Sequence, residues 1–168
     1  MKKILLLLLI LCVVSCASPI LDVETSVPHE QQISAVLDDF HAAASEADSD
    51  RYFGYFASDA VLIGTDATER WSLEEFRPHL KPILDQGRGW TYTMTSRHVF
   101  CSKDQRTAWF DEMTQNEKLG ECRGTGVLVW EESVWKIAQY HLTIPIPNDL
   151  AHEFVTKIRE FQTKEPGQ

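Results

Sequence analysis

The second half of the chain holds four runs rich in aromatic and β-branched residues, and short polar turns separate them. The runs are 90–100, 106–116, 122–130 and 134–144. Such residues favour strands, and connections this short join antiparallel neighbours. The pattern therefore predicts a four-stranded antiparallel meander. Pro145 and Pro147 end the last strand, because proline cannot donate a hydrogen bond to a sheet ladder.

Helical patterns precede and follow this meander. Apolar residues spaced three and four apart predict helices, and one short apolar run predicts a further strand. The expected helices cover 30–44, 48–57, 72–84 and 148–161, and the expected strand covers 60–63. Ser72 and Glu75 form a capping-box pair at the start of the third helix, and Asn148 can cap the last. The order of elements predicts an α+β fold.

The first residues have the pattern of a targeting signal. Lys2 and Lys3 precede an apolar run over 4–14, which is shorter than the roughly 20 residues of a membrane-spanning helix. The sequence Val13-Val14-Ser15-Cys16 resembles a lipobox, in which the cysteine is lipidated. We expect a lipid anchor at Cys16 in the cell envelope, on the outer membrane facing the periplasm if the host has two membranes. The alternative is an ordinary secretory peptide with an incidental cysteine.

These features divide the chain into four parts. They are a signal peptide over 1–15, a flexible tether over 16–29, one domain over 30–147, and a C-terminal helix and tail over 148–168. Loss of Lys2 and Lys3 with the signal peptide changes the formal net charge from −9 to −11. Nucleic-acid binding needs a basic surface, so this balance argues against that class of partner.

Two cysteines remain after the signal peptide and the lipidation site are set aside. Cys101 ends one predicted strand and Cys122 begins the next but one, so the whole intervening strand separates them. A disulfide needs Cα atoms within about 7 Å. We therefore predict two unpaired thiols. The spacing of His, Asp and Glu suggests no metal site, and we expect no cofactor.

Three segments resemble the SnoaL-like domains of the nuclear-transport-factor-like superfamily, which includes ketosteroid isomerases, dehydratases and cyclases. They are Phe56-Ala57-Ser58-Asp59-Ala60-Val61, 123–129 and 135–142, and the resemblance runs from about Gln31 to Ile146. It implies a cone-shaped, curled antiparallel sheet wrapped around the N-terminal helices, with a pocket open at one end and an added C-terminal helix. Folds of this kind host many functions, so the resemblance indicates the fold more strongly than the activity.

The resemblance also allows the pocket side of the sheet to be predicted. A tight turn at Lys118-Leu119 would place Glu112 opposite Thr125, and a turn at Glu132-Ser133 would place Thr125 opposite Tyr140. In relatives, the alternate residues after the position of Trp135 face the pocket. We therefore expect the pocket face to hold Glu112, Arg123, Thr125 and Tyr140 as ligand-binding residues. A slip of one residue would exchange the faces of a strand.

The expected chemistry centres on Glu112. A buried carboxylate needs a partner, and Arg123 is its diagonal neighbour in this register. The pair would be structural, or would orient Arg123 toward an anionic or carbonyl ligand beside Tyr140. Glu112 and Asp66, in the polar loop near the expected pocket mouth, are the candidate catalytic carboxylates. The position that matches the isomerase general base falls near Gly64, which puts isomerase chemistry in doubt.

The other side of the predicted sheet is rich in large apolar residues, including Trp109, Trp130 and Trp135, with Leu128 and Ile137. Exposed patches of this kind mark interfaces. Relatives dimerise through this surface, so we expect a homodimer, or coverage of the patch by the C-terminal helix.

Three functions follow as hypotheses. The first is a binding domain for a small, partly apolar molecule in the cone. The second is an isomerase, dehydratase or cyclase that uses a pocket carboxylate. The third is an interaction module whose cone is filled with side chains. A sizeable cavity would exclude the third, and an unpaired pocket carboxylate would favour the second.

Overall fold

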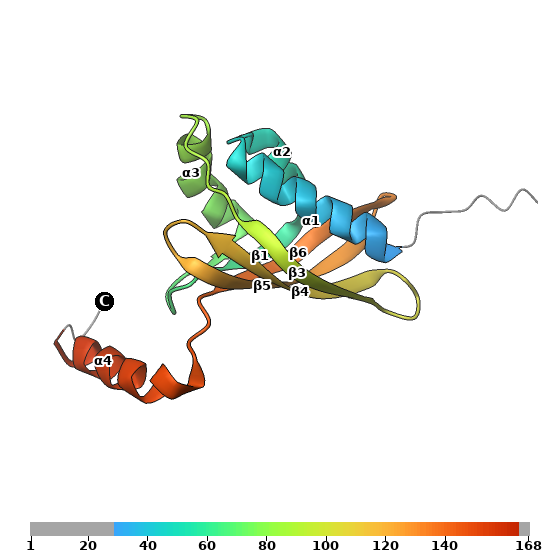
Figure 1. Cartoon of the computed structure of the whole chain (residues 1–168). Helices are drawn as coiled ribbons and strands as arrows, with labels where there is room; N and C mark the ends of the chain where they lie inside the picture. Colours follow the sequence, from blue (N-terminus) through green and yellow to red (C-terminus); the bar gives the residue numbers. More distant parts are fainter. Residues whose placement is uncertain (1–28, 165–168) are drawn as a thin grey trace, which may run out of the picture.

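The computed structural model describes residues 29–164, and its elements build one α+β domain followed by a separate helix (Figure 1). The predicted signal peptide, the lipidation site at Cys16 and the tether up to residue 28 lie outside the described residues. The lipid anchor and the envelope location therefore stay predictions. None of the helices in the described range is long and apolar enough to cross a bilayer.

The sheet has six strands in the order β2-β1-β6-β5-β4-β3. They are β1 (Phe56–Ile63), β2 (Arg70–Ser72), β3 (Thr93–Cys101), β4 (Thr107–Asn116), β5 (Gly120–Glu131) and β6 (Val134–Thr143). The strands β3 to β6 form the predicted antiparallel meander. The strand β1 pairs in parallel with β6, which closes the N-terminal half of the chain onto the end of the meander.

Three helices cover one face of the curled sheet (Figure 1). They are α1 (His29–Ser45), α2 (Ser49–Gly54) and α3 (Leu73–Leu84). The capping box between Ser72 and Glu75 starts α3 as predicted, and α3 continues through Pro78 and Pro82. The second helix is shorter than the predicted 48–57, because the chain already extends into β1 from Phe56.

The core lies between α1 and the concave face of the sheet. Ile33 and Leu37 of α1 and Leu128 and Ile137 of the sheet are all fully buried. Removing side chains of this size from water contributes roughly 1.5–3 kcal/mol each. This core fixes α1, and with it the polar side chains of its inner face, against the middle of the sheet.

The predicted register between β4 and β5 is wrong by one residue. Glu112 pairs with Gly124, and not with Thr125. The connection has three residues between Asn116 and Gly120, because the Asn116 side chain accepts hydrogen bonds from the backbone of Lys118 and Leu119. Gly120, the first residue of β5, adopts a positive φ of 72°, which glycine tolerates without a Cβ clash. The slip turns the odd-numbered residues of β5 to the outer face.

A β-bulge makes a second correction, on β6. The predicted two-residue turn at Glu132-Ser133 forms, but the pairing of β5 with β6 shifts between Val127 and Leu128. The slip between β4 and β5 carries through this turn, so Trp135 and Ile137 face the core, contrary to the prediction. The bulge then reverses the alternation along β6, so Tyr140 still faces inward. The Trp135 indole Nε1 donates to His29 Nδ1 of α1 at 3.2 Å, so this tryptophan anchors the start of α1.

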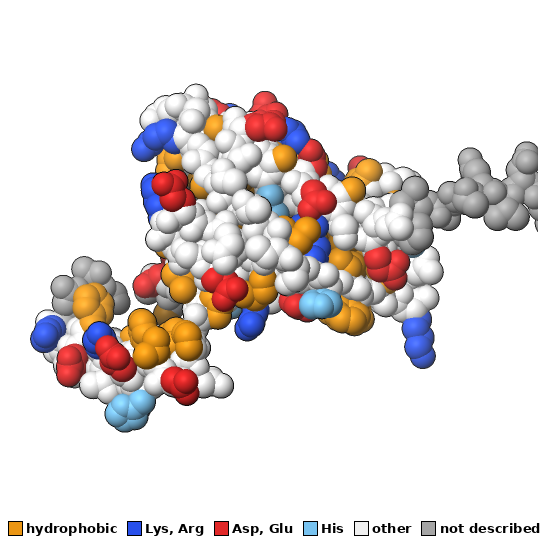
Figure 2. Space-filling model, viewed as in Figure 1, with side chains coloured by type: hydrophobic (Ala, Val, Ile, Leu, Met, Phe, Trp, Pro, Cys, Tyr) orange, Lys and Arg blue, Asp and Glu red, His pale blue; other side chains and the backbone are white. Residues whose placement is uncertain are grey.

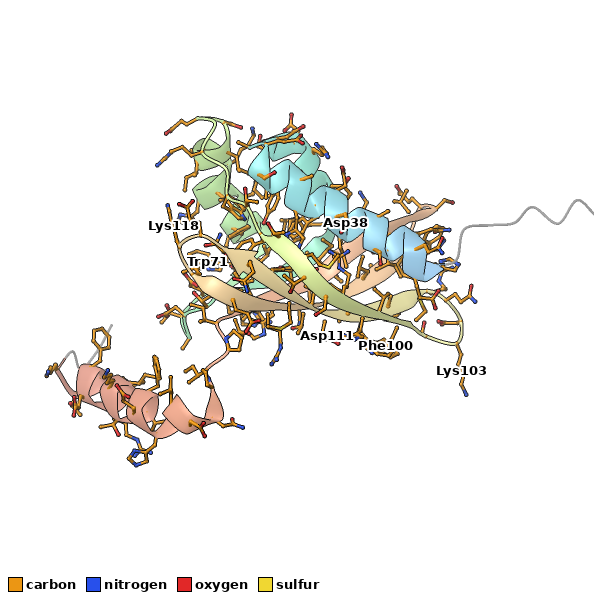
Figure 3. All side chains as sticks on the ribbon, viewed as in Figure 1. Asp38, Trp71, Phe100, Lys103, Asp111 and Lys118 are labelled. Atoms are coloured by element: carbon orange, nitrogen blue, oxygen red, sulfur yellow. The ribbon has the colours of Figure 1, made fainter. Side chains whose placement is uncertain are left out.

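The convex face of the sheet keeps Trp109 of the predicted apolar patch. Trp109 is 47% exposed and stacks on Phe100, which is 48% exposed, with ring centroids 6.0 Å apart. Figure 3 shows Phe100 and Asp111 projecting from the side of the sheet opposite the helices. Leu128, Trp135 and Ile137, predicted here, lie in the core instead. The predicted homodimer stays a prediction.

The C-terminal helix does not cover this face. After the short η1 (Asn148–Leu150), α4 (Ala151–Lys164) lies away from the sheet, and its described residues are all exposed. Figure 2 shows hydrophobic side chains gathered on the side of α4 turned toward the domain. The predicted helix therefore forms, but it does not cover the sheet, which was the alternative to a homodimer.

The two cysteine thiols of the described chain are both free, as predicted. Cys101 pairs with Ala108 at one end of β4, and Cys122 pairs with Thr114 near the other end. Burial raises the pKa of the Cys122 thiol, which keeps it protonated and unreactive.

Candidate functional site

A buried carboxylate organises the polar centre of the concave face. Glu112 is 1% exposed and lies in the middle of β4. One oxygen, Oε1, lies 2.7 Å from His41 Nε2 of α1 and accepts the Tyr140 hydroxyl of β6 at 3.3 Å. The other oxygen, Oε2, accepts Arg97 Nε of β3 at 2.8 Å. Four elements of the fold therefore meet at this single side chain.

Arg97 continues the network to the surface of α1. Its Nη1 donates to the Ser34 carbonyl at 3.0 Å and to Asp38 Oδ1 at 2.7 Å. Its Nη2 lies 2.8 Å from Glu112 Oε2, a charge contact whose angle falls outside hydrogen-bond geometry. The Arg97 side chain is 4% exposed, so the carboxylates of Glu112 and Asp38 must compensate its positive charge in place of water. Figure 3 labels Asp38 on α1, above the sheet.

The protonation states follow from these contacts. Burial raises the pKa of Glu112, but the hydrogen bond and charge of His41 and the charge of Arg97 outweigh it, so the pKa is lowered overall. Burial and the nearby charge of Glu112 raise the pKa of Tyr140 well above its usual value. Glu112 is therefore a carboxylate that only accepts, and Tyr140 is a neutral phenol.

Gly124 makes room for this cluster. A Cβ at this position would lie 2.7 Å from the Tyr140 hydroxyl and 2.9 Å from Glu112 Oε1. The contact is possible because Gly124 is the direct cross-strand partner of Glu112. The glycine thus allows the carboxylate and the phenol to meet above the sheet.

A cavity of about 210 Å³ opens beside the cluster. His41 and Tyr140 are the members of the cluster that line it, and the remaining wall is mostly apolar. Its aromatic side chains come from α1, α2, α3, β2, β6 and the segment before β3, and they are Phe40, Tyr52, Trp71, Phe76, Trp90, Tyr92 and Tyr140. The cavity is therefore an aromatic hollow with polar groups at one side.

One carboxylate lies in the wall away from Glu112. Glu69, from the turn between β1 and β2, lines the cavity next to Gly64 and Trp71. Its Oε2 accepts the Asp66 backbone N–H at 3.1 Å. A Cβ at Gly64 would overlap this carboxylate, so the glycine leaves the space that Glu69 occupies.

The structure brings two of the predicted site residues together and separates the others. Glu112 and Tyr140 lie in contact. Arg123 is exposed and Thr125 half-buried on the outer face, because of the register slip. Asp66 is exposed and binds the backbone and hydroxyl of Thr68, at 2.8 Å and 2.6 Å, in the β1–β2 turn. The guanidinium beside Glu112 is that of Arg97, not of Arg123.

Comparison with known proteins decides the family. The family model described as a SnoaL-like domain matches residues 33–147. The chain belongs to the SnoaL-like domain family. No curated protein matches this SnoaL-like chain.

Solved structures share the fold of this SnoaL-like domain. An NTF2-like protein of unknown function from Pseudomonas putida KT2440 is 12% identical, with a TM-score of 0.60 over 71% of this chain and 89% of that chain. A protein assigned as a dehydratase of the NTF2-like family, from Streptomyces avermitilis, is 16% identical, with a TM-score of 0.57 over 70% and 96%. A protein assigned as a ketosteroid isomerase, from Shewanella frigidimarina, is 19% identical, with a TM-score of 0.56 over 68% and 97%. Identities this low establish the fold alone.

Sequence reasoning missed three side chains of the SnoaL-like site. His41 follows Leu37 by four residues and so belongs to the inner stripe of α1. A titratable residue in an apolar stripe is a pattern that could have identified His41 as a candidate site residue. Arg97 is the direct cross-strand partner of Glu112, but the register of β3 was not fixed by the sequence. Glu69 lies three residues after Asp66 in the same polar loop, and no local pattern marks it as a residue that lines the cavity.

The lowered pKa of Glu112 predicts a pH dependence for this domain. A carboxyl whose pKa falls on folding stabilises the fold above its unfolded value, here 4.5, and that contribution is lost as the pH falls through the lower folded value. We expect the urea midpoint of the wild type to fall below about pH 4.5. The Glu112→Gln variant should show a shallower decline across the same window.

The surface pair of Asp39 and Arg51 provides an internal reference for this experiment. The hydrogen bond from Arg51 lowers the pKa of Asp39 to about 2, so its contribution is lost at lower pH in both proteins. Parallel curves for wild type and Glu112→Gln between pH 5 and about pH 3 would contradict the assignment of the acid sensitivity to Glu112.

Proposed function

We propose that this SnoaL-like domain reversibly binds a small, mostly apolar molecule in the aromatic cavity. The observation that carries the proposal is the cavity itself, an apolar hollow with His41 and Tyr140 at one side. Small-molecule sites are concave, lined by aromatic and aliphatic groups, and contain a few polar groups that fix orientation. A cone closed by its own side chains, as a pure interaction module would have, does not agree with this cavity.

The size of the cavity limits the molecule. A cavity of about 210 Å³ is smaller than sites for drug-sized ligands, which begin near 300 Å³. An apolar protein cavity of about 150 Å³ binds benzene. A molecule with one six-membered ring and a compact substituent therefore fits the available space.

The polar side of the cavity offers hydrogen-bond acceptors. Because Glu112 only accepts, His41 Nε2 carries a proton and donates it; the other ring nitrogen, Nδ1, accepts when the ring is neutral and donates when it is charged. His41 Nδ1 has no hydrogen-bond partner among residues 29–164. Tyr140 donates its proton to Glu112, which leaves its oxygen free to accept. A ligand with a hydrogen-bond donor matches this arrangement.

Binding of the neutral one-ring probe tert-butylbenzene tests the proposal. Saturation-transfer NMR should show saturable binding to the wild type, and the fluorescence of Trp71 and Trp90 should respond because both line the cavity. Leu142→Trp fills the cavity and should weaken binding at least about tenfold, which corresponds to about 1.4 kcal/mol. Val127→Trp, on β5, introduces the same side chain on the outer face of the sheet and should leave binding unchanged.

The absence of saturable binding to a folded wild type would overturn the proposed function. Equal loss of binding in both tryptophan variants, with both still folded by circular dichroism, would show that the probe binds elsewhere. Native mass spectrometry of protein isolated from its own host then identifies a retained molecule.

A second candidate function is an isomerase or dehydratase reaction, and the His41–Glu112 pair favours it. A histidine oriented by a carboxylate is a common general base. In this arrangement His41 would take the proton and Glu112 would hold the ring, because a carboxylate paired with Arg97 and lowered in pKa is a weak base. This second function would be established if the wild type converts a bound ring substrate and the His41→Gln variant still binds that substrate but no longer converts it.

A further inference from the structure

The lining of the cavity has a charge bias. Glu69 contributes a carboxylate, and the described residues of the lining include neither lysine nor arginine. Arg97, the guanidinium of the polar cluster, is committed to Glu112, Asp38 and the Ser34 carbonyl and does not line the cavity. Glu69 is therefore the carboxylate of the described lining, and His41, the histidine of that lining, is already paired with Glu112.

The Glu69 carboxylate is positioned rather than free to rotate into solvent. Its Oε2 is held by the Asp66 backbone N–H, and the backbone of Glu69 accepts Gly64 N at 2.9 Å and donates to the Asp66 carbonyl at 3.0 Å. Gly64 leaves the space beneath the carboxylate empty of side chain. The second oxygen, Oε1, has no hydrogen-bond partner among the described residues.

Aromatic side chains share the lining of the cavity with Glu69. Trp71, which Figure 3 labels, and Trp90 both line the cavity, and Trp90 packs edge-on against Tyr52 with centroids 5.6 Å apart. The faces of such rings carry negative potential and attract a cation within about 6 Å of the ring centroid, tryptophan most strongly. A carboxylate beside several ring faces is the arrangement that recognises ammonium groups.

We propose that the cavity selects small organic cations, namely aromatic or alkyl amines and quaternary ammonium compounds. This inference rests on the proposed binding function and names its ligand class. The ammonium group lies against the Glu69 carboxylate and the tryptophan faces, and the apolar part of the ligand fills the hollow toward Phe40. The formal net charge of −9 adds an attraction for cations at longer range.

Three probes of similar shape and different charge test this inference. They are phenyltrimethylammonium, its uncharged carbon isostere tert-butylbenzene, and the anion benzenesulfonate. Titrations at constant ionic strength should give the cation an affinity about tenfold higher than that of the isostere, which corresponds to about 1.4 kcal/mol. The anion should bind more weakly than both.

Glu69→Gln removes the charge and keeps the shape of the side chain. It should lower the affinity for the cation about tenfold and leave the affinity for tert-butylbenzene unchanged. Glu121→Gln, at an exposed position of β5 outside the cavity lining, makes the same change in net charge and should alter neither affinity.

The possible results separate this inference from the proposed function. Equal affinities for the cation and its isostere, or a preference for the anion, overturn the cation inference and leave the binding function intact. Binding of none of the probes to the folded protein overturns both. Equal effects of Glu69→Gln and Glu121→Gln show that the preference reflects net charge alone and overturn the assignment to Glu69.

Discussion

Replacing Glu112 with leucine is expected to lower the free energy of unfolding by about 3–5 kcal/mol, measured by urea denaturation at pH 7. The loss arises because Arg97, whose side chain is 4% exposed, would keep its charge in the core without the carboxylate that accepts it. His41 and Tyr140 would lose the same acceptor. We thus expect the loss of stability to come mainly from leaving Arg97 charged and unpaired, and less from the net stabilisation that the intact ion pair provides.

A double-mutant cycle with Arg97→Met separates that penalty from the loss of packing. If the uncompensated charge causes the effect, the double variant should recover much of the stability that Glu112→Leu removes, because a buried ion pair replaced by apolar side chains is often tolerated. Asp39→Asn is the matched control at an exposed ion pair, where Asp39 and Arg51 are 40% and 30% exposed. That control should cost less than about 1 kcal/mol.

A loss below about 1 kcal/mol for Glu112→Leu would contradict this account. So would strictly additive effects in the cycle, because residues that share one network are expected to couple.

Gly126→Ala is the second substitution for which a large effect is expected. A Cβ at this position would overlap the Gln139 carbonyl of β6 and lie 2.7 Å from the Phe110 ring. The carbonyl belongs to the backbone of the neighbouring strand, directly beside the β-bulge, so it cannot move without disturbing the sheet. We expect the free energy of unfolding to fall by about 1–3 kcal/mol in urea denaturation.

Gly54→Ala is the control for this substitution. No atom lies within 4 Å of a Cβ at this exposed helical position, and alanine restricts the unfolded chain more than glycine does. Gly54→Ala is therefore expected to raise the free energy of unfolding by about 0.4–1 kcal/mol. Equal destabilisation by both substitutions would show that the close approach at Gly126 does not limit stability.

The amino-acid sequence by itself determined the order and type of the elements. Alternating aromatic and β-branched residues define β3 to β6, and the Ser72–Glu75 capping box starts α3 where predicted. These signals are local, since strand alternation and helix capping depend on residues only a few positions apart. The same local patterns carried the resemblance to the SnoaL-like family.

The site depended on long-range geometry that the sequence does not encode locally. One additional residue in the loop after Asn116 turned Arg123 and Thr125 away from Glu112, because side chains alternate with a period of two. The bulge after Ile137 then returned Tyr140 to the inner face. Tyr140 therefore pairs with Gly126 and not with Thr125, the partner that the prediction gave it.

The sequence therefore determined that this chain builds a helix-covered meander with a buried glutamate on one strand. Only the tertiary structure decided that His41 from α1 and Arg97 from β3 complete its charge balance, 71 and 15 residues away along the chain. The physical reason is that a buried carboxylate takes whichever donors the packed helix and the neighbouring strand bring within about 3 Å. That selection is made by register and packing, after the local elements have formed.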